Sequence, residues 1–75
     1  MDILKKADLG EGTTIELLAI PEDIRLPFRV RLVDDDTGEE VPMFTRRYDD
    51  EAAAQACFDR QVDHHQAHLL RSVAA

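Results

Sequence analysis

Three side chains near the end of the sequence have the types and spacing of a metal site. Cys57, His64 and His68 fall within an arc of about 40° when residues are plotted around a helix at about 100° each. His64 and His68 are four positions apart, which places their imidazoles on adjacent turns within reach of one ion. A metal-responsive protein that uses Cys57, His64 and His68 is therefore one reading of this sequence.

Other features of the same residues weigh against metal chemistry and against catalysis. Cys57 lies two turns from the histidines, and no glutamate stands beside them in the pattern of a hydrolytic metal site. A cysteine next to an apolar helix stripe is typically a small buried hydrophobic residue. A nucleophilic Cys–His pair also needs an oriented base and an oxyanion site, and the sequence indicates neither. We expect no metal, no cofactor and no enzymatic activity.

These residues belong to a helix that is predicted over residues 50–72. Asp49 or Asp50 suits the N-cap, and Glu51 adds negative charge at the positive end of the helix dipole. The alanine-rich run that follows strongly favours a helix. One apolar stripe is predicted to cover a sheet, and it consists of Ala54, Phe58, Val62, His65, Leu69 and Val73.

The sheet is predicted mainly from a β-hairpin with arms at residues 26–34 and 40–48. The first arm alternates apolar residues with arginines, and the second is rich in β-branched and aromatic residues. The acidic connection between them suits a turn with Gly38 in the left-handed conformation, followed by a glycine bulge. This turn places Asp35 opposite Glu39 and Val30 opposite Phe44. The even-numbered residues of both arms then share one face.

Residues 13–20 predict a further strand, and residues 1–12 are interpreted as an irregular lead-in with at most a short strand around residues 2–5. The lead-in ends in a flexible Gly10-Glu11-Gly12 breaker. Pro42 lacks a ladder donor, which favours an edge position for the last strand. We predict an α+β fold in a single small domain over residues 1–75. A three-stranded antiparallel meander is expected at 13–20, 26–34 and 40–48, with the C-terminal helix at 50–72 packed across one face.

Composition limits the classes of function. The 75 residues carry a formal net charge of −7, which argues against direct binding to nucleic acid or to an anionic membrane. One cysteine excludes an internal disulfide, and we expect a cytoplasmic protein without a leader segment. A core this small is marginal, because such a chain buries only about 60% of its unfolded surface. A partner or a second copy would therefore add useful stability.

Two surfaces remain after the core has been assigned. The outer sheet face combines apolar and arginine side chains, as the centres of protein interfaces do. The helix, at about 33 Å, is longer than an eight-residue strand of about 26 Å, so its last turns extend past the sheet. The predicted protein-binding residues are Arg29, Arg31, Val33, Val41, Met43 and, on the helix extension, Leu70.

The leading hypothesis is a non-enzymatic protein-binding or regulatory module that forms a homodimer. An alternative is an inhibitor whose acidic clusters imitate a nucleic-acid backbone and block a nucleic-acid-binding enzyme. In size and charge the chain is similar to small acidic inhibitors encoded by phages and plasmids. The arginines of the hairpin interrupt the negative field that such mimicry needs. No motif in the sequence identifies a family.

Overall fold

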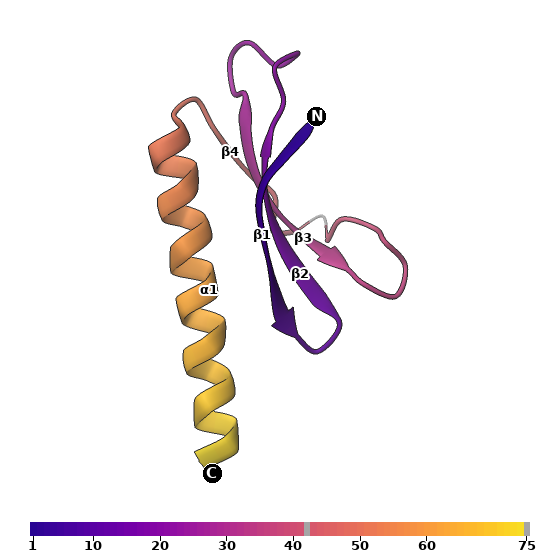
Figure 1. Ribbon diagram of the computed structural model, residues 1–75, viewed down its shortest axis with the longest axis vertical. Helices are drawn as coiled ribbons and strands as arrows, with labels where there is room; N and C mark the ends of the chain where they lie inside the picture. Colours follow the sequence, from indigo (N-terminus) through magenta and orange to yellow (C-terminus); the bar gives the residue numbers. More distant parts are fainter. Residues whose placement is uncertain (42, 75) are drawn as a thin grey trace.

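The structure, a computed structural model, describes the backbone of residues 1–41 and 43–74 and the side chains of residues 1–41 and 43–65. Within these residues, four strands form one antiparallel sheet in sequence order, and a helix lies along one face of it (Figure 1). The predicted α+β layout with a C-terminal helix is confirmed. The elements are β1 (Asp2–Gly10), β2 (Thr13–Ala19), β3 (Phe28–Asp34), β4 (Arg46–Tyr48) and α1 (Glu51–Ala74).

The interpretation of residues 1–12 as an irregular lead-in is wrong. These residues form β1, a nine-residue edge strand that pairs with the whole of β2. The register shifts between Ile3 and Lys5, so Leu4 is an extra residue at a β-bulge. The bulge reverses which side chains face the core: Ile3 lies opposite Leu18 on one face, whereas Ala7 packs toward the helix on the other.

The Gly10-Glu11-Gly12 segment is a tight turn and not a flexible breaker. Gly10 pairs with Thr13, which leaves two residues in the turn. Glu11 and Gly12 have φ values of 56° and 74°. Positive φ at both central residues is the requirement of the two-residue turn that best matches the twist of a hairpin.

The acidic turn after β3 agrees with its prediction in conformation. Gly38 has a φ of 73°, in the left-handed region. The Gly38 N–H donates to the Asp34 carbonyl at 2.7 Å, and the Asp34 N–H donates to the Glu39 carbonyl at 2.9 Å. One residue therefore faces two, as in a glycine bulge. Asp34, and not the predicted Asp35, is the residue opposite Glu39.

The last strand is shorter than predicted, and its register differs. Only Arg46–Tyr48 continues the ladder, with Val30 opposite Arg46 and Phe28 opposite Tyr48. The predicted pairing of Val30 with Phe44 is wrong by two residues. Beyond the isolated Val33–Glu40 bridge, the Val41 N–H still donates to the Leu32 carbonyl at 2.8 Å, and the Phe44 N–H donates to the Val41 carbonyl at 3.2 Å. Pro42 lies outside the described residues, so its expected edge position stays a prediction.

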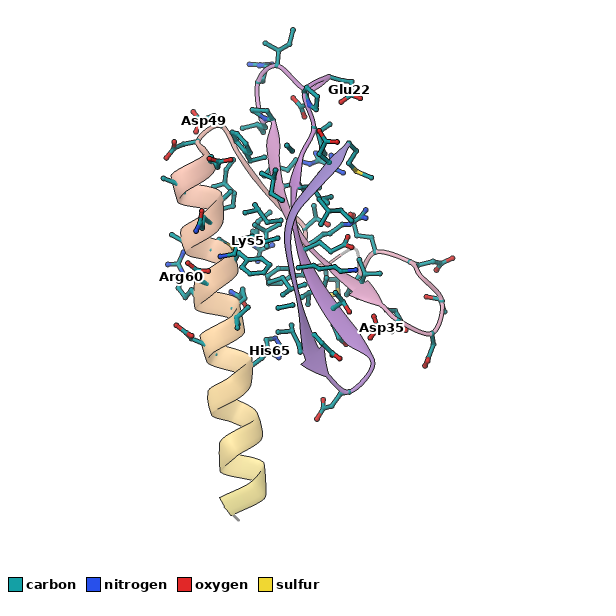
Figure 2. The ribbon with its side chains drawn as sticks, in the orientation of Figure 1. Lys5, Glu22, Asp35, Asp49, Arg60 and His65 are labelled. Carbon is teal, nitrogen blue, oxygen red and sulfur yellow. The ribbon has the colours of Figure 1, made fainter. Side chains whose placement is uncertain are left out.

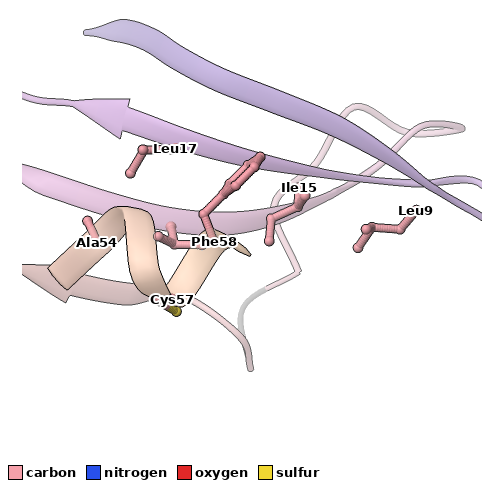
Figure 3. Packing of buried hydrophobic residues seen from close by; sticks show 7 residues of the cluster. Leu9, Ile15, Leu17, Ala54, Cys57 and Phe58 are labelled. Carbon is pink, nitrogen blue, oxygen red and sulfur yellow. The ribbon is translucent and has the colours of Figure 1, made fainter. Parts of the chain in front are cut away.

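The core lies between the sheet and the first turns of α1 (Figure 3). Ile15, Leu17 and Val30 are almost fully buried from the sheet side. From the helix, Ala54 and Phe58 pack against them, and Val62 is partly buried, as the stripe predicts. The side chains of Leu69 and Val73 lie outside the described residues. The rest of the cluster consists of Leu9 and Cys57, with Ala7, Phe28, Leu32, Phe44 and Tyr48 partly buried around it.

Helix α1 begins where its capping residues predict and continues beyond the sheet. The Asp50 carboxylate accepts a hydrogen bond from the Ala53 N–H at 3.2 Å, which is an N-cap contact. The helix has 24 residues and spans about 36 Å, whereas the seven residues of β2 span about 23 Å. Figure 1 shows the last turns of α1 extending past the β1–β2 turn, which gives the molecule its 46 Å length.

Candidate protein interface on the outer sheet face

The face of the sheet opposite α1, here called the outer face, is not covered by another described element. Its residues follow from strand register, because side chains alternate between faces and paired residues share one. Most are polar or charged, whereas the centre of the helix side is apolar. They are Ile3, Lys6, Asp8, Thr14, Glu16, Leu18, Arg29, Arg31, Val33 and Arg47.

Arg31 is held in a network of carboxylates at the middle of this face. Its Nε donates to Glu16 Oε1 at 2.8 Å, and its Nη1 lies 3.6 Å from Glu40 Oε1. The second Glu40 oxygen accepts a hydrogen bond from Thr45 Oγ1 at 2.8 Å. Glu16 is only 9% exposed, so this pair is partly desolvated and sensitive to the loss of either partner. Arg31 therefore has a structural role that limits its availability to a partner molecule.

Arg29 and Arg47 differ from Arg31 because their charges are not neutralised. They lie directly opposite each other on β3 and β4. None of the ion pairs among the described side chains includes either arginine. The Nε of Arg29 is buried and has no hydrogen-bond partner. Like charges placed opposite each other destabilise a sheet, so this pair is a site where an added carboxylate would be stabilising.

An apolar row accompanies the arginine pair. Leu18 is 0% exposed although no described helix covers its face, and its ladder neighbours are Ile3 and Arg29. The methylene stem of an arginine can shield an apolar neighbour in this way. Ile3 itself is 52% exposed at the edge of the sheet. Exposed apolar surface beside unpaired arginines is the composition expected for an interface centre.

The structure separates the predicted interface residues into three groups. Arg29, Arg31 and Val33 lie on the outer face as expected. Val41 and Met43 are not on a strand, because the second hairpin arm is shorter than predicted; Val41 is half-buried and Met43 is 91% exposed. The side chain of Leu70 lies outside the described residues.

The sequence analysis missed Ile3, Glu16 and Arg47 as members of this face. Ile3 was missed because the bulge at Leu4 removes the alternation that predicts a strand. Arg47 lies within the predicted arm at residues 40–48, but its pairing with Arg29 depends on a register that the hydrophobic pattern does not fix. The charge pattern of Glu16 against Arg31 could have indicated a cross-strand pair, since opposite charges favour facing positions.

The acidic residues cluster around the turn after β3 and at the start of α1, and these two clusters lie on different sides of the molecule. The first consists of Asp34, Asp35, Asp36, Glu39 and Glu40, and the second of Asp49, Asp50 and Glu51. The connection between β3 and β4 projects on the side of the sheet away from α1, whereas Asp49 stands at the helix start (Figures 1 and 2). Thr14 Oγ1 donates to Asp35 Oδ1 at 2.7 Å, which ties the projecting turn to β2. The Asp35 N–H also donates to the Gly12 carbonyl at 2.8 Å. This acidic turn therefore has a defined attachment beside the outer face.

The residues proposed as metal ligands do not share one environment. Cys57 is buried in the core cluster (Figure 3), whereas His64 is exposed. His65 is half-buried, and its ring centroid lies 5.9 Å from that of His64. The side chain of His68 lies outside the described residues. Among the described side chains, no group of three histidine, cysteine or acidic residues could hold a metal ion.

Cys57 instead has a polar contact with Tyr48 at the edge of the core. A hydrogen bond with Cys57 is the main cause that raises the pKa of Tyr48 above its ordinary value of 10.0. Burial of the phenol and the nearby Cys57 charge act in the same direction, while Arg60 and Arg46 oppose the rise. The raised pKa favours the neutral phenol. This pair lies under α1 and not on the outer face.

Comparisons of the chain with models of protein families, with curated proteins and with solved structures found no match. Within the described residues, no helix is long and apolar enough to cross a membrane. The chain is thus defined as a small α+β protein with a four-stranded antiparallel sheet and one helix in the described residues. What is inferred about its function rests on its own residues.

Proposed function

We propose that this chain is a non-enzymatic protein-binding or regulatory module that works as a homodimer. The contact surface is the outer face, together with the residues of the β3–β4 connection and the extension of α1. The predicted contributors are those named from the sequence: Arg29, Arg31, Val33, Val41, Met43 and Leu70. Among them, Arg31 has mainly a structural role, because its ion pairs with Glu16 and Glu40 link β3 to β2 and to the β3–β4 connection.

The observation that carries this proposal is the outer face itself. One side of the sheet is packed by α1, while the other exposes Ile3 and carries Arg29 and Arg47, which form no ion pair with a described carboxylate. Large apolar side chains are also exposed elsewhere, including Met43 of the β3–β4 connection at 91%. A second chain would cover this surface and add to a core that is thin for a stable domain.

The single cysteine and the polar composition support a reducing compartment such as the cytoplasm. Cys57 is buried in the core, so an intermolecular disulfide is not part of the proposed contact. The dimer is held by noncovalent contacts between faces.

Sedimentation equilibrium across micromolar concentrations tests the proposal. The expected result is a mass of two chains, and a monomer of 8.5 kDa at every concentration would contradict the homodimer. Met43→Glu and Leu70→Asp should each weaken association, because each places a charge in apolar contact surface. Asp63→Glu, an exposed change on α1 that keeps its charge, serves as the control.

A further inference from the structure

The outer face has opposite charges at its two ends. Arg29 and Arg47 lie at the end near the β2–β3 connection, and no described carboxylate pairs with them. The other end of the same strand, five residues after Arg29, is Asp34 at the start of the acidic turn. The two ends are therefore about 17 Å apart along β3.

The acidic end is built to reach outward. The acidic turn (Asp35, Asp36 and Glu39) is exposed and projects on the side away from α1 (Figure 2). It is also anchored, because Asp35 is hydrogen-bonded through its side chain to Thr14 and through its N–H to Gly12. Its shape is thus fixed before any partner arrives, which reduces the entropy lost on binding.

We propose that the partner of the outer face is a second copy of this chain, packed face to face with its strands antiparallel to those of the first. The acidic turn of each copy then covers the Arg29–Arg47 pair of the other. This inference rests on the proposed homodimer and specifies its arrangement. The carboxylates of the acidic turn accept hydrogen bonds from the two guanidinium groups. Ile3, which is 52% exposed in the same cross-strand row as Arg29, supplies apolar surface beside the arginine end.

The charges favour antiparallel packing of the two sheets over parallel packing. If two outer faces met with their strands in the same direction, each arginine pair would face another arginine pair and each acidic turn another acidic turn. A two-fold axis that lies in the interface, perpendicular to the strands, reverses the strand direction of one copy. Each arginine pair then meets an acidic turn of the other copy. The same axis makes two identical contacts, and the assembly closes as a dimer. Arg31 lies near this axis, where Glu16 and Glu40 neutralise it and no charge opposes the contact.

The test uses two reversals at exposed positions, Arg47→Glu and Asp36→Lys, each with a matched control on α1. Arg60→Glu and Asp63→Lys change the net charge by the same amounts at exposed helix positions. Each interface variant should raise the dimer dissociation constant by about tenfold or more, because symmetry places each reversed charge in two contacts. The controls should stay within about twofold of the unaltered chain.

The direction of the Asp36→Lys effect separates this contact from general repulsion. The chain has a net charge of −7, so a less negative variant should associate more strongly if only overall charge mattered. The antiparallel contact predicts instead that Asp36→Lys associates more weakly. Raising NaCl from about 0.05 M to about 0.5 M should likewise weaken the unaltered dimer, whereas screening of general repulsion would strengthen it.

Mixing the two weakened variants is the decisive experiment. In a heterodimer of Arg47→Glu with Asp36→Lys, one contact pairs the introduced Glu with the introduced Lys, and the other keeps the original Arg47 and Asp36. Both contacts are attractive, although each variant alone has two repulsive ones. Native mass spectrometry of an equimolar mixture should therefore show the heterodimer well above the statistical proportion, with its affinity restored to that of the unaltered chain.

The possible results are distinct. A selective heterodimer supports the antiparallel arrangement. If the unaltered chain dimerises but the interface variants behave like their α1 controls, or the mixture shows no preference, the arrangement is overturned and the homodimer stands. If the unaltered chain is a monomer at all concentrations, both the homodimer and this arrangement are overturned. Circular dichroism spectra of the variants should match that of the unaltered chain, since both altered side chains are exposed.

Discussion

At the scale of single residues, the contact between Tyr48 and Cys57 has the clearest chemical consequence. The hydrogen bond with Cys57, the main cause, and burial both favour the neutral phenol and raise its pKa. Tyr48 is the only tyrosine in the chain, and tryptophan is absent. A spectrophotometric titration of the folded protein therefore reports on this one side chain.

The titration midpoint of Tyr48 should lie above 10.0 in the folded chain. Cys57→Ala should lower that midpoint, because it removes the hydrogen bond, and Arg60→Gln should raise it further, because it removes a positive charge that favours phenolate. The two variants thus move one signal in opposite directions. A midpoint that ignores Cys57→Ala would contradict the contact.

The same shift makes stability depend on alkaline pH. A group whose pKa is raised on folding stabilises the fold fully below its unfolded pKa and loses this contribution as pH rises through the folded pKa. Tyr48 should therefore contribute its full share below about pH 10 and progressively less at higher pH. The free energy of unfolding, measured in urea, should fall more steeply with pH in that window for the unaltered chain than for Tyr48→Phe, which has no phenol proton to lose.

At the scale of elements, the errors in the assignment of β1 and in the register of β4 have one cause, since each involves a residue pattern that a bulge or loop alters. The bulge at Leu4 changes the parity of β1, so Ile3 and Ala7 face opposite sides despite an even separation. The register of β4 differs by two residues from the expected one. A shift of two keeps each side chain on its face, so the alternation that predicted the hairpin agrees equally well with both registers.

The helix start was predictable because its capping residues act locally. Asp50 caps the Ala53 N–H, whereas its neighbour Asp49 makes no hydrogen bond to the described helix backbone. Asp50→Ala should cost about 0.5–2 kcal/mol of unfolding free energy, and Asp49→Ala should cost much less. Equal losses in urea unfolding would show that charge near the helix dipole, and not the cap, is responsible.

The β1–β2 turn has a residue type that does not suit its conformation. Glu11 has a φ of 56°, a region that costs an ordinary side chain about 1–2 kcal/mol and that asparagine tolerates better. Glu11→Asn creates the Asn-Gly pair that hairpin turns prefer. We expect a stability gain of about 0.5–1 kcal/mol, or a rise in the melting temperature of about 2–8 °C.

Glu22→Asn is the matched control for this change, because it removes the same charge at an exposed loop position. It should leave the melting temperature nearly unchanged, since its ion pair with the N-terminus is long, at 4.0 Å, and exposed. If both variants stabilised equally, relief of net negative charge and not turn conformation would be the cause.

At the scale of the whole molecule, the packing of the helix on the sheet was predictable, whereas the outer face was predictable only for its β3 residues Arg29, Arg31 and Val33. The apolar stripe of the helix and the alternation of β3 depend on local spacing, and they correctly place Phe58 against Val30. The arginine pair depends on which residue of β4 meets Arg29, and Ile3 joins the face only through a bulge. Such non-local register is set by turn geometry and loops, which the alternation of side chains does not specify.

The last prediction follows from a thin core that a second chain completes. If the folded chains are dimers and the unfolded chains are monomers, mass action makes the melting temperature rise with concentration. A tenfold increase contributes about 1.4 kcal/mol per dimer, or about 0.7 kcal/mol per chain. For a domain of this size that corresponds to a rise of about 3–6 °C. Arg47→Glu should melt at a temperature that no longer depends on concentration, because its dimer is weakened, whereas Arg60→Glu should retain the dependence. A melting temperature of the unaltered chain that is constant over two decades of concentration would instead mean that the sheet and helix of one chain are sufficient for folding.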